Sequence, residues 1–164
     1  MLWLGDIWLG LCIYKKYQIM NQLTPTVRQM FALINDGLNC DDASATFCMD
    51  GDGNWKLIKR PYLSFSSHFR KYYCVPAFTL SDMLQLLPPS IDEYKLSVYK
   101  VNGQECVQYE DPTTHIGKLY MHAPTRLMAV YRAIELLITE GIIETNKTFN
   151  YDERIVPLKR STAR

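Results

Sequence analysis

Hydrophobic residues recur at helical spacing in the first clearly patterned stretch of the chain. Thr24 has the residue type of an N-cap, and Pro25 suits the first helical position, where the missing N–H costs nothing. The helix should end at Gly37, with Leu38 folding back onto its last turn. Its apolar stripe is formed by Val27, Met30, Phe31 and Ile34.

The next segment offers several interpretations. Residues Asp41–Ala45 are expected to add one helical turn, so the region superficially resembles a helix-turn-helix, although an ordinary capped helix is favoured. The acidic run 50–54 fails as an EF-hand calcium loop, because Trp55 and Pro61 stand where Gly and Glu are required. Its Asp-Gly pairs instead predict a tight turn between short strands at 47–49 and 55–58.

A short leucine-rich helix is predicted after Thr79. Thr79 and Asp82 have the spacing of a capping box, and Pro88-Pro89 ends the helix. A stripe this rich in leucine is typical of a helix surrounded by other elements, which is the favoured interpretation. The alternative is an exposed surface for a partner protein, formed by Leu80, Met83, Leu84 and Leu87.

The alternating pattern from Tyr94 to Glu110 predicts a β-hairpin. Asn102-Gly103 is typical of a two-residue type I′ turn, which sets Lys100 across from Glu105. A third run, His115–Met121, is expected to extend the sheet as a meander. In this register one apolar face carries Tyr94, Leu96, Val98, Val107 and Tyr109.

A second long helix, Pro124–Glu140, has an apolar stripe that can cover this face. Gly141 is expected to end it, with Ile142 as the hydrophobic fold-back. The predicted fold class is therefore α+β, a small antiparallel meander sheet packed against N-terminal and C-terminal helices. The stripe consists of Leu127, Val130, Tyr131, Ile134, Leu137 and Ile138.

The pattern divides the chain into three regions. Residues 1–22 form a hydrophobic extension, too short for a bilayer span of about 20 residues and without the features of a secretory signal. This extension either packs on the domain or a lipid surface, or reflects a start codon upstream of a native start at Met20, which we favour. Residues 23–143 form a single α+β domain, and residues 144–164 form a polar tail.

Composition narrows the class of protein. The chain has 164 residues, 48% of them hydrophobic, and a net charge of +1, which excludes disorder and any whole-protein attraction to nucleic acid or anionic membrane. Its five scattered cysteines include no Cys-x-x-Cys pair, so they indicate neither a disulfide framework nor a zinc site. We expect a reducing cytoplasm, and no metal or cofactor.

Positive and aromatic residues are interleaved between Trp55 and Tyr73, with no acidic residue among them. Cations for phosphates and ring faces for bases are typical of single-stranded nucleic-acid binding. The favoured alternative is a solvated loop or edge strand whose aromatic residues fill the core. The candidate nucleic-acid or partner-binding residues are Lys56, Lys59, Arg60, Tyr62, Phe65, Arg70 and Lys71.

No catalytic motif is present in the sequence. The three histidines, His68, His115 and His122, have no metal-ligand spacing. A catalytic dyad of Cys106 or Cys74 with His115 or His122 stays open, because such pairs are assembled in space. Buried cysteines and partly exposed histidines are the favoured interpretation.

The segments taken together resemble small proteins of unassigned activity encoded by phages, prophages and conjugative elements of gut Bacteroidetes. The similarity covers about Leu23–Ile143 and follows the order LTPTVRQMFALINDGL, VPAFTLSDMLQLLPPSI, YKLSVYKVNGQECVQYED and MAVYRAIELLITEGII. Members of that family often carry Trp where Leu136 stands, and their counterpart of 56–73 is variable or shorter. The resemblance implies a mobile-element protein in the cytoplasm of a bacterial host, and transfers no site residues.

Three functions follow as hypotheses. The first is a non-enzymatic protein that binds a host or phage protein, for which the leucine-rich stripe is one candidate surface. The second is single-stranded nucleic-acid binding through the basic and aromatic residues of 55–73. The third, a Cys/His enzyme, is the least favoured.

Overall fold

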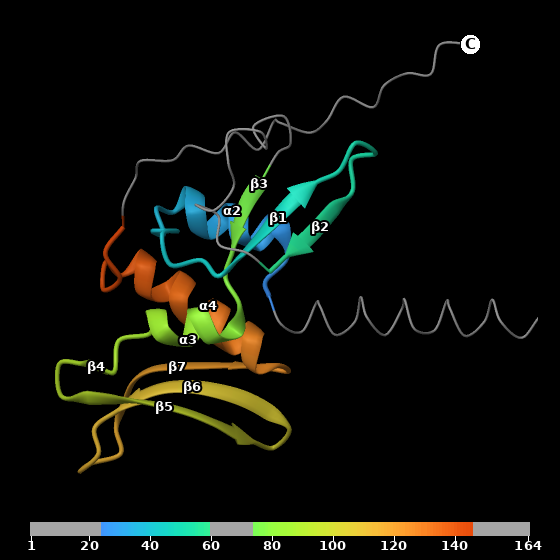
Figure 1. The fold of residues 1–164 in the computed structure, drawn as a ribbon. Helices are drawn as coiled ribbons and strands as arrows, with labels where there is room; N and C mark the ends of the chain where they lie inside the picture. Colours follow the sequence, from blue (N-terminus) through green and yellow to red (C-terminus); the bar gives the residue numbers. More distant parts are fainter. Residues whose placement is uncertain (1–23, 60–73, 146–164) are drawn as a thin grey trace, which may run out of the picture.

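The computed structural model describes residues 24–59 and 74–145. Within these residues it contains three helices and two antiparallel sheets, of three and four strands. The two sheets lie at opposite ends of the molecule, with α3 and α4 between them and α2 beside the three-stranded sheet (Figure 1). The predicted α+β class with a meander sheet is confirmed.

Helix α2 (Val27–Asn35) begins two residues later than predicted. Its N-cap is Thr26, whose hydroxyl accepts a hydrogen bond from the Gln29 backbone N–H at 3.3 Å. In return, the Gln29 side-chain oxygen accepts from the Thr26 backbone N–H at 2.9 Å. The prediction of Thr24 as the cap was wrong because only Thr26 has a glutamine three residues later to complete a capping box. The predicted end is confirmed, since Gly37 has a φ of 99° and the Leu38 N–H donates to the Leu33 carbonyl at 2.9 Å.

The prediction of one helical turn over Asp41–Ala45 was wrong. A single hydrogen-bonded turn, closed from Ala43 to Cys40 at 3.1 Å, is followed directly by strand β1 (Ala45–Met49). Strand β1 is the central strand of the three-stranded sheet, between β2 (Trp55–Ile58) and β3 (Cys74–Ala77). The two strands predicted on either side of the acidic turn are therefore confirmed, and the resemblance to a helix-turn-helix fails.

Helix α3 (Leu80–Leu86) has the capping box predicted from Thr79 and Asp82. The Asp82 carboxylate accepts from the Thr79 N–H at 2.7 Å, and the Thr79 hydroxyl accepts from the Asp82 N–H at 3.3 Å. Helix α3 leads through its two prolines to the short strand β4 (Ser90–Ile91), at one edge of the four-stranded sheet.

The predicted hairpin forms the centre of the four-stranded sheet. Strands β5 (Tyr94–Val101) and β6 (Gln104–Glu110) pair in the predicted register, with Lys100 opposite Glu105. Asn102 and Gly103 both have positive φ, 49° and 77°, as a type I′ turn requires. Strand β7 (Gly117–Ala123) adds the third strand of the meander, and starts later than predicted because residues 112–116 form the connecting turn.

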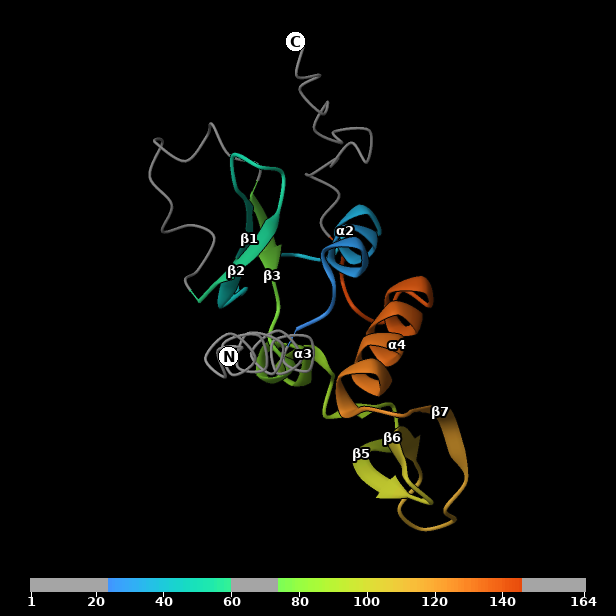
Figure 2. The same ribbon diagram turned by 90° about the vertical axis from the view of Figure 1, so that its right-hand side faces the viewer.

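Helix α4 (Arg126–Thr139) lies against β6 and β7 on one side and against α3 on another (Figure 2). It begins after the N-cap Thr125, whose hydroxyl accepts from the Met128 N–H, and not at Pro124. Its end at Gly141 is as predicted, with Ile142 donating to the Leu137 carbonyl at 2.9 Å. The N-terminal helix α2 packs on β3, so the two terminal helices serve different sheets.

One hydrophobic core joins these elements, and Ile134, Val107 and Phe78 are among its fully buried members. Across the described ranges, none of the helices has the length and apolar character needed to cross a membrane. The N-terminal extension and residues 146–164 of the polar tail lie outside the described residues, so the predictions made for them stay predictions.

Candidate binding face of the four-stranded sheet

Among the described residues, helices cover one face of the four-stranded sheet and leave the other face uncovered. Side chains alternate along each strand, and the apolar set that includes Leu96, Val107 and Tyr109 packs into or against the core. The described helices all lie on the core side of the sheet (Figures 1 and 2). The pairing register places the other set together on the opposite side. Six of its residues form what we call the open face, and these are Tyr99, Val101, Cys106, Gln108, Tyr120 and His122; the same alternation puts Lys95, Ser97, Gln104 and Glu110 on this side of the sheet as well.

Large side chains are exposed on the open face. Tyr99 is 36% exposed, Val101 41% and Tyr120 50%. Only two other large hydrophobic residues in the described ranges are as exposed, and they are Ile116 in the turn before β7 and Ile142 after α4. Scattered exposed apolar residues are ordinary, but a contiguous group on one uncovered face indicates an interaction surface.

The two tyrosines reach toward the central strand β6 from opposite sides. The Tyr99 hydroxyl donates to the Gln108 side-chain oxygen, and the Gln108 amide donates to the Glu110 carboxylate at 3.0 Å. From β7, the Tyr120 hydroxyl lies 3.3 Å from the Cys106 sulfur. Cys106 belongs to the open face and is nevertheless fully buried. The rings of Tyr99 and Tyr120 therefore form a layer on this face, and the hydrogen bonds of their hydroxyl groups hold it in place.

These contacts favour the neutral form of both tyrosines, whose ordinary pKa of about 10 already leaves them uncharged at neutral pH. The hydrogen bond with the Cys106 thiol raises the pKa of Tyr120, and partial burial raises that of Tyr99, with smaller contributions from Cys106 and Glu110. The two tyrosines of the open face therefore offer ring surfaces and hydroxyl groups that carry no charge at neutral pH.

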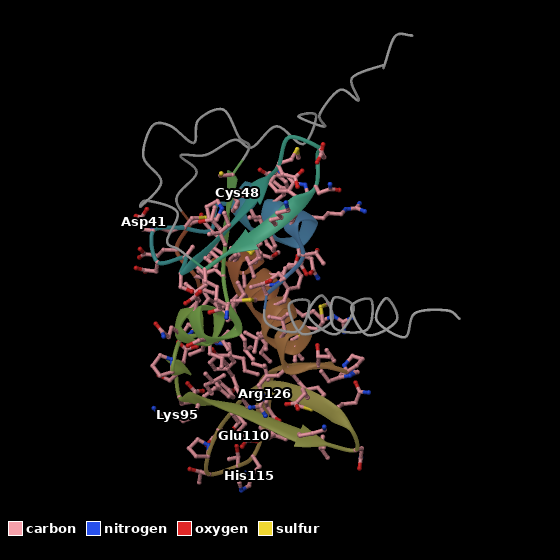
Figure 3. The ribbon with its side chains drawn as sticks, turned by 45° about the vertical axis from the view of Figure 1, so that its right-hand side comes forward. Asp41, Cys48, Lys95, Glu110, His115 and Arg126 are labelled. Atoms are coloured by element: carbon pink, nitrogen blue, oxygen red, sulfur yellow. The ribbon has the colours of Figure 1, made fainter. Side chains whose placement is uncertain are left out.

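The margin of the open face is balanced in charge. Lys95 and Glu110 are register partners at one end of the sheet, where Figure 3 labels both. Nearby, the Lys118 ammonium is bonded to the Asp92 carboxylate and lies 5.5 Å from the centre of the Tyr94 ring. Along β5, Lys95 alternates onto the same side as Tyr99 and Val101, with Glu110 opposite it on β6. A phosphate backbone needs cations for most of its binding energy, and a carboxylate opposite the lysine works against such binding.

One of the predicted Cys–His combinations is brought together here, since Cys106 and His122 are register partners. The Cys106 sulfur contacts the Tyr120 hydroxyl, and the His122 ring lies 5.8 Å from the Tyr120 ring, centre to centre. A thiol–imidazole dyad needs the sulfur within hydrogen-bond reach of the ring. The contacts of Cys106 and His122 instead make the tyrosine their common neighbour.

The remaining residues of the proposed dyads lie apart. His115 is in the turn beyond the sheet, labelled in Figure 3, and Cys74 is in the other sheet, opposite Cys48. His68 lies outside the described residues. In the described ranges no group of three or more histidine, cysteine, aspartate or glutamate side chains is placed to hold a metal ion.

The basic and aromatic segment is only partly described. The Lys56 ammonium lies 2.9 Å from the Asp50 carboxylate, and this hydrogen bond lowers the pKa of Asp50. Trp55 packs edge-on against Phe31, with ring centres 6.2 Å apart. Lys59 is the last residue of the described range 24–59. The other candidates lie outside the described residues, and these are Arg60, Tyr62, Phe65, Arg70 and Lys71.

The leucine-rich stripe of α3 faces the interior. Met83 and Leu87 are buried in the hydrophobic core, and Leu80 and Leu84 are partly buried against it. This is the arrangement that the sequence analysis favoured for the helix. The partner-binding alternative would have to displace these side chains from the core.

The open face was not predicted from the sequence, although a signal for it is present. Val101, Tyr99 and Tyr120 occupy strand positions that alternate with the core set, where polar residues are usual. The pairing of Cys48 with Cys74 was also missed.

Comparison of the chain with models of protein families, with curated proteins and with solved structures finds no match.

Proposed function

We propose that this protein is a non-enzymatic binding protein and that the open face is its contact surface for another protein. The observation that carries the proposal is the grouping of Tyr99, Val101 and Tyr120 on one uncovered sheet face. Interface centres are enriched in aromatic residues and poor in charge, as this face is.

The tyrosine contacts reduce the cost of binding. The Tyr99 hydroxyl is already bonded to Gln108, and the Tyr120 hydroxyl is in contact with Cys106. Less side-chain freedom is therefore lost when a partner covers the rings. Tyrosine residues held in this way are common as the energetic centres of protein interfaces.

The chemistry of the face indicates the kind of partner. Neutral rings, an aliphatic side chain and the exposed His122 suit a protein surface with apolar groups and few charges. Ring faces also stack on nucleic-acid bases, but the one lysine that β5 places on this side, Lys95, has Glu110 as its register partner, and this balance of charge favours a protein. In line with the resemblance, we place the partner in a bacterial cytoplasm, as a host or phage protein.

Site-specific crosslinking tests this proposal. A photoreactive benzophenone amino acid is placed at Tyr120 and, as the control, at the exposed Ile116 outside the face. Each protein is irradiated in a nuclease-treated bacterial lysate, and the captured partner is purified for calorimetry. We expect crosslinking from position 120, and a partner affinity that falls at least about tenfold in Tyr99→Ser/Tyr120→Ser. Ile116→Ser should bind as the unmodified chain does.

An unchanged affinity in the double variant would contradict the proposal, as would equal crosslinking from both positions. Labelled single-stranded DNA and RNA form a second arm of the experiment, measured at two salt concentrations. Salt-sensitive binding that the double variant loses would assign the face to nucleic acid instead.

A further inference from the structure

Two cysteines face each other in the three-stranded sheet, at the end of the molecule away from the open face (Figure 1). Cys48 on β1 and Cys74 on β3 are register partners, and their sulfur atoms lie 2.7 Å apart. Both are free thiols in the structure. The two side chains are already in contact, so the sulfur atoms have only a short distance to move to the S–S bond length of about 2.05 Å.

The backbone already has the spacing of a disulfide. Directly opposed residues on antiparallel strands have Cα atoms about 4.5–5.5 Å apart, and disulfides join Cα atoms about 4.4–6.8 Å apart. The register partners on either side, including Phe47 with Val75, hold β1 and β3 in this alignment. Oxidation therefore needs no rearrangement of the two strands.

We propose that Cys48 and Cys74 are a thiol-modification site that forms a reversible disulfide by exchange with a small-molecule disulfide such as oxidised glutathione. The Cys74 thiolate attacks one sulfur of the glutathione disulfide and releases one glutathione thiolate. The Cys48 thiol then loses its proton, attacks the Cys74 sulfur and releases the second glutathione. The two protein thiols are oxidised, and one disulfide is reduced to two thiols.

Exposure sets the order of these steps. Cys74 is partly exposed and Cys48 is buried, so the reagent reaches Cys74 first. Burial, together with the hydrogen bond between the Cys48 and Cys74 thiols, raises the pKa of Cys48 to about 12. Cys48 therefore reacts poorly with a reagent in solution, but it stands beside the mixed disulfide once this has formed on Cys74.

The other described cysteines have different partners. Cys40 lies with its sulfur 3.4 Å from the Leu38 carbonyl, and Cys106 is enclosed on the open face beside Tyr120. Among the described cysteines, Cys48 and Cys74 are thus the pair whose sulfur atoms are in contact. They lie in the other sheet, so their oxidation does not depend on the proposed function of the open face.

Equilibration in glutathione buffers tests the pair in the full chain. The protein is held at a series of ratios of reduced to oxidised glutathione, quenched in acid, alkylated, and mapped by peptide mass spectrometry. We expect Cys48 and Cys74 to lose reactivity together and to appear in one crosslinked peptide pair. The oxidised chain should unfold roughly 10 °C higher than the reduced one, because the bond closes a loop of the unfolded chain.

Variants separate this pairing from other oxidations. Cys40→Ser should oxidise as the unmodified chain does, whereas Cys48→Ser and Cys74→Ser should lose the paired oxidation. Mapping of the unmodified chain decides the question even if a serine variant fails to fold. Thiols at Cys48 and Cys74 that stay reduced in excess oxidised glutathione would overturn the proposal, as would a disulfide that joins either of them to another cysteine.

Discussion

At the scale of single residues, Tyr109 shows how one buried polar atom is satisfied inside the core. Its side chain is fully buried on the covered face of the sheet, and its hydroxyl donates to the Pro88 carbonyl at 2.7 Å. This bond links β6 to the turn that follows α3. Burial raises the pKa of Tyr109 to about 12, so the ring stays neutral well beyond the usual range.

The raised pKa of Tyr109 predicts a pH dependence of stability. The pKa of Tyr109 in the folded chain exceeds its value of about 10 in the unfolded chain. The contribution of this shift to the free energy of unfolding is therefore fully present below about pH 10. It is lost as the pH rises from there through the folded pKa of about 12. We expect Tyr109→Phe to cost about 1 kcal/mol at neutral pH and to unfold with a shallower loss of stability across that alkaline range. Urea unfolding at several pH values measures both, and an unchanged alkaline slope would contradict the assignment.

At the scale of elements, Asp82 connects the start of α3 to the segment before β1. Its carboxylate accepts from the Thr79 N–H at 2.7 Å and from the Ser44 hydroxyl at 2.6 Å. One side chain therefore caps a helix and ties it to the residue that precedes β1. The contact with Ser44 spans 38 positions in the sequence.

This double role predicts a larger loss than an ordinary helix cap gives. We expect Asp82→Ala to lower the free energy of unfolding by about 2 kcal/mol, because a charged acceptor of several hydrogen bonds is removed. The exposed Asp41→Ala serves as the control and should change stability by less than about 0.5 kcal/mol. Urea unfolding of these variants, with Ser44→Ala and the double variant, gives the coupling energy. Additive losses from Ser44 and Asp82 would show that the link contributes nothing.

Local sequence signals predicted most of the helices and strands. The ends of these elements were predicted best where a glycine residue ends a helix or forms a turn. Gly37 and Gly141 end their helices with positive φ, and Asn102-Gly103 sets the hairpin register. The start of α2 was misplaced because Thr24 and Thr26 are both good caps, and a hydrogen bond to the Gln29 side chain decides between them. The extra helical turn before β1 failed because pairing of β1 with β3, distant in sequence, determines that segment.

At the scale of the whole molecule, the candidate sites depend on contacts that no local pattern contains. Tyr99 and Tyr120 become one surface only when β5 and β7 flank β6 and when α4 covers the other face. Cys48 and Cys74 meet only through the register of β1 with β3. The hairpin pattern defined the core face correctly, and it led to no prediction for the opposite face.

Footprinting of the full chain by hydroxyl radicals tests most directly the claim that one face of this sheet is core and the other is uncovered. Mass spectrometry follows modification at each tyrosine in the isolated protein. The account predicts that Tyr99 and Tyr120 react several-fold faster than Tyr109 and Tyr131, which are buried on the core side. Protection of Tyr99 and Tyr120 in the isolated chain, or equally fast modification of Tyr109, would contradict it.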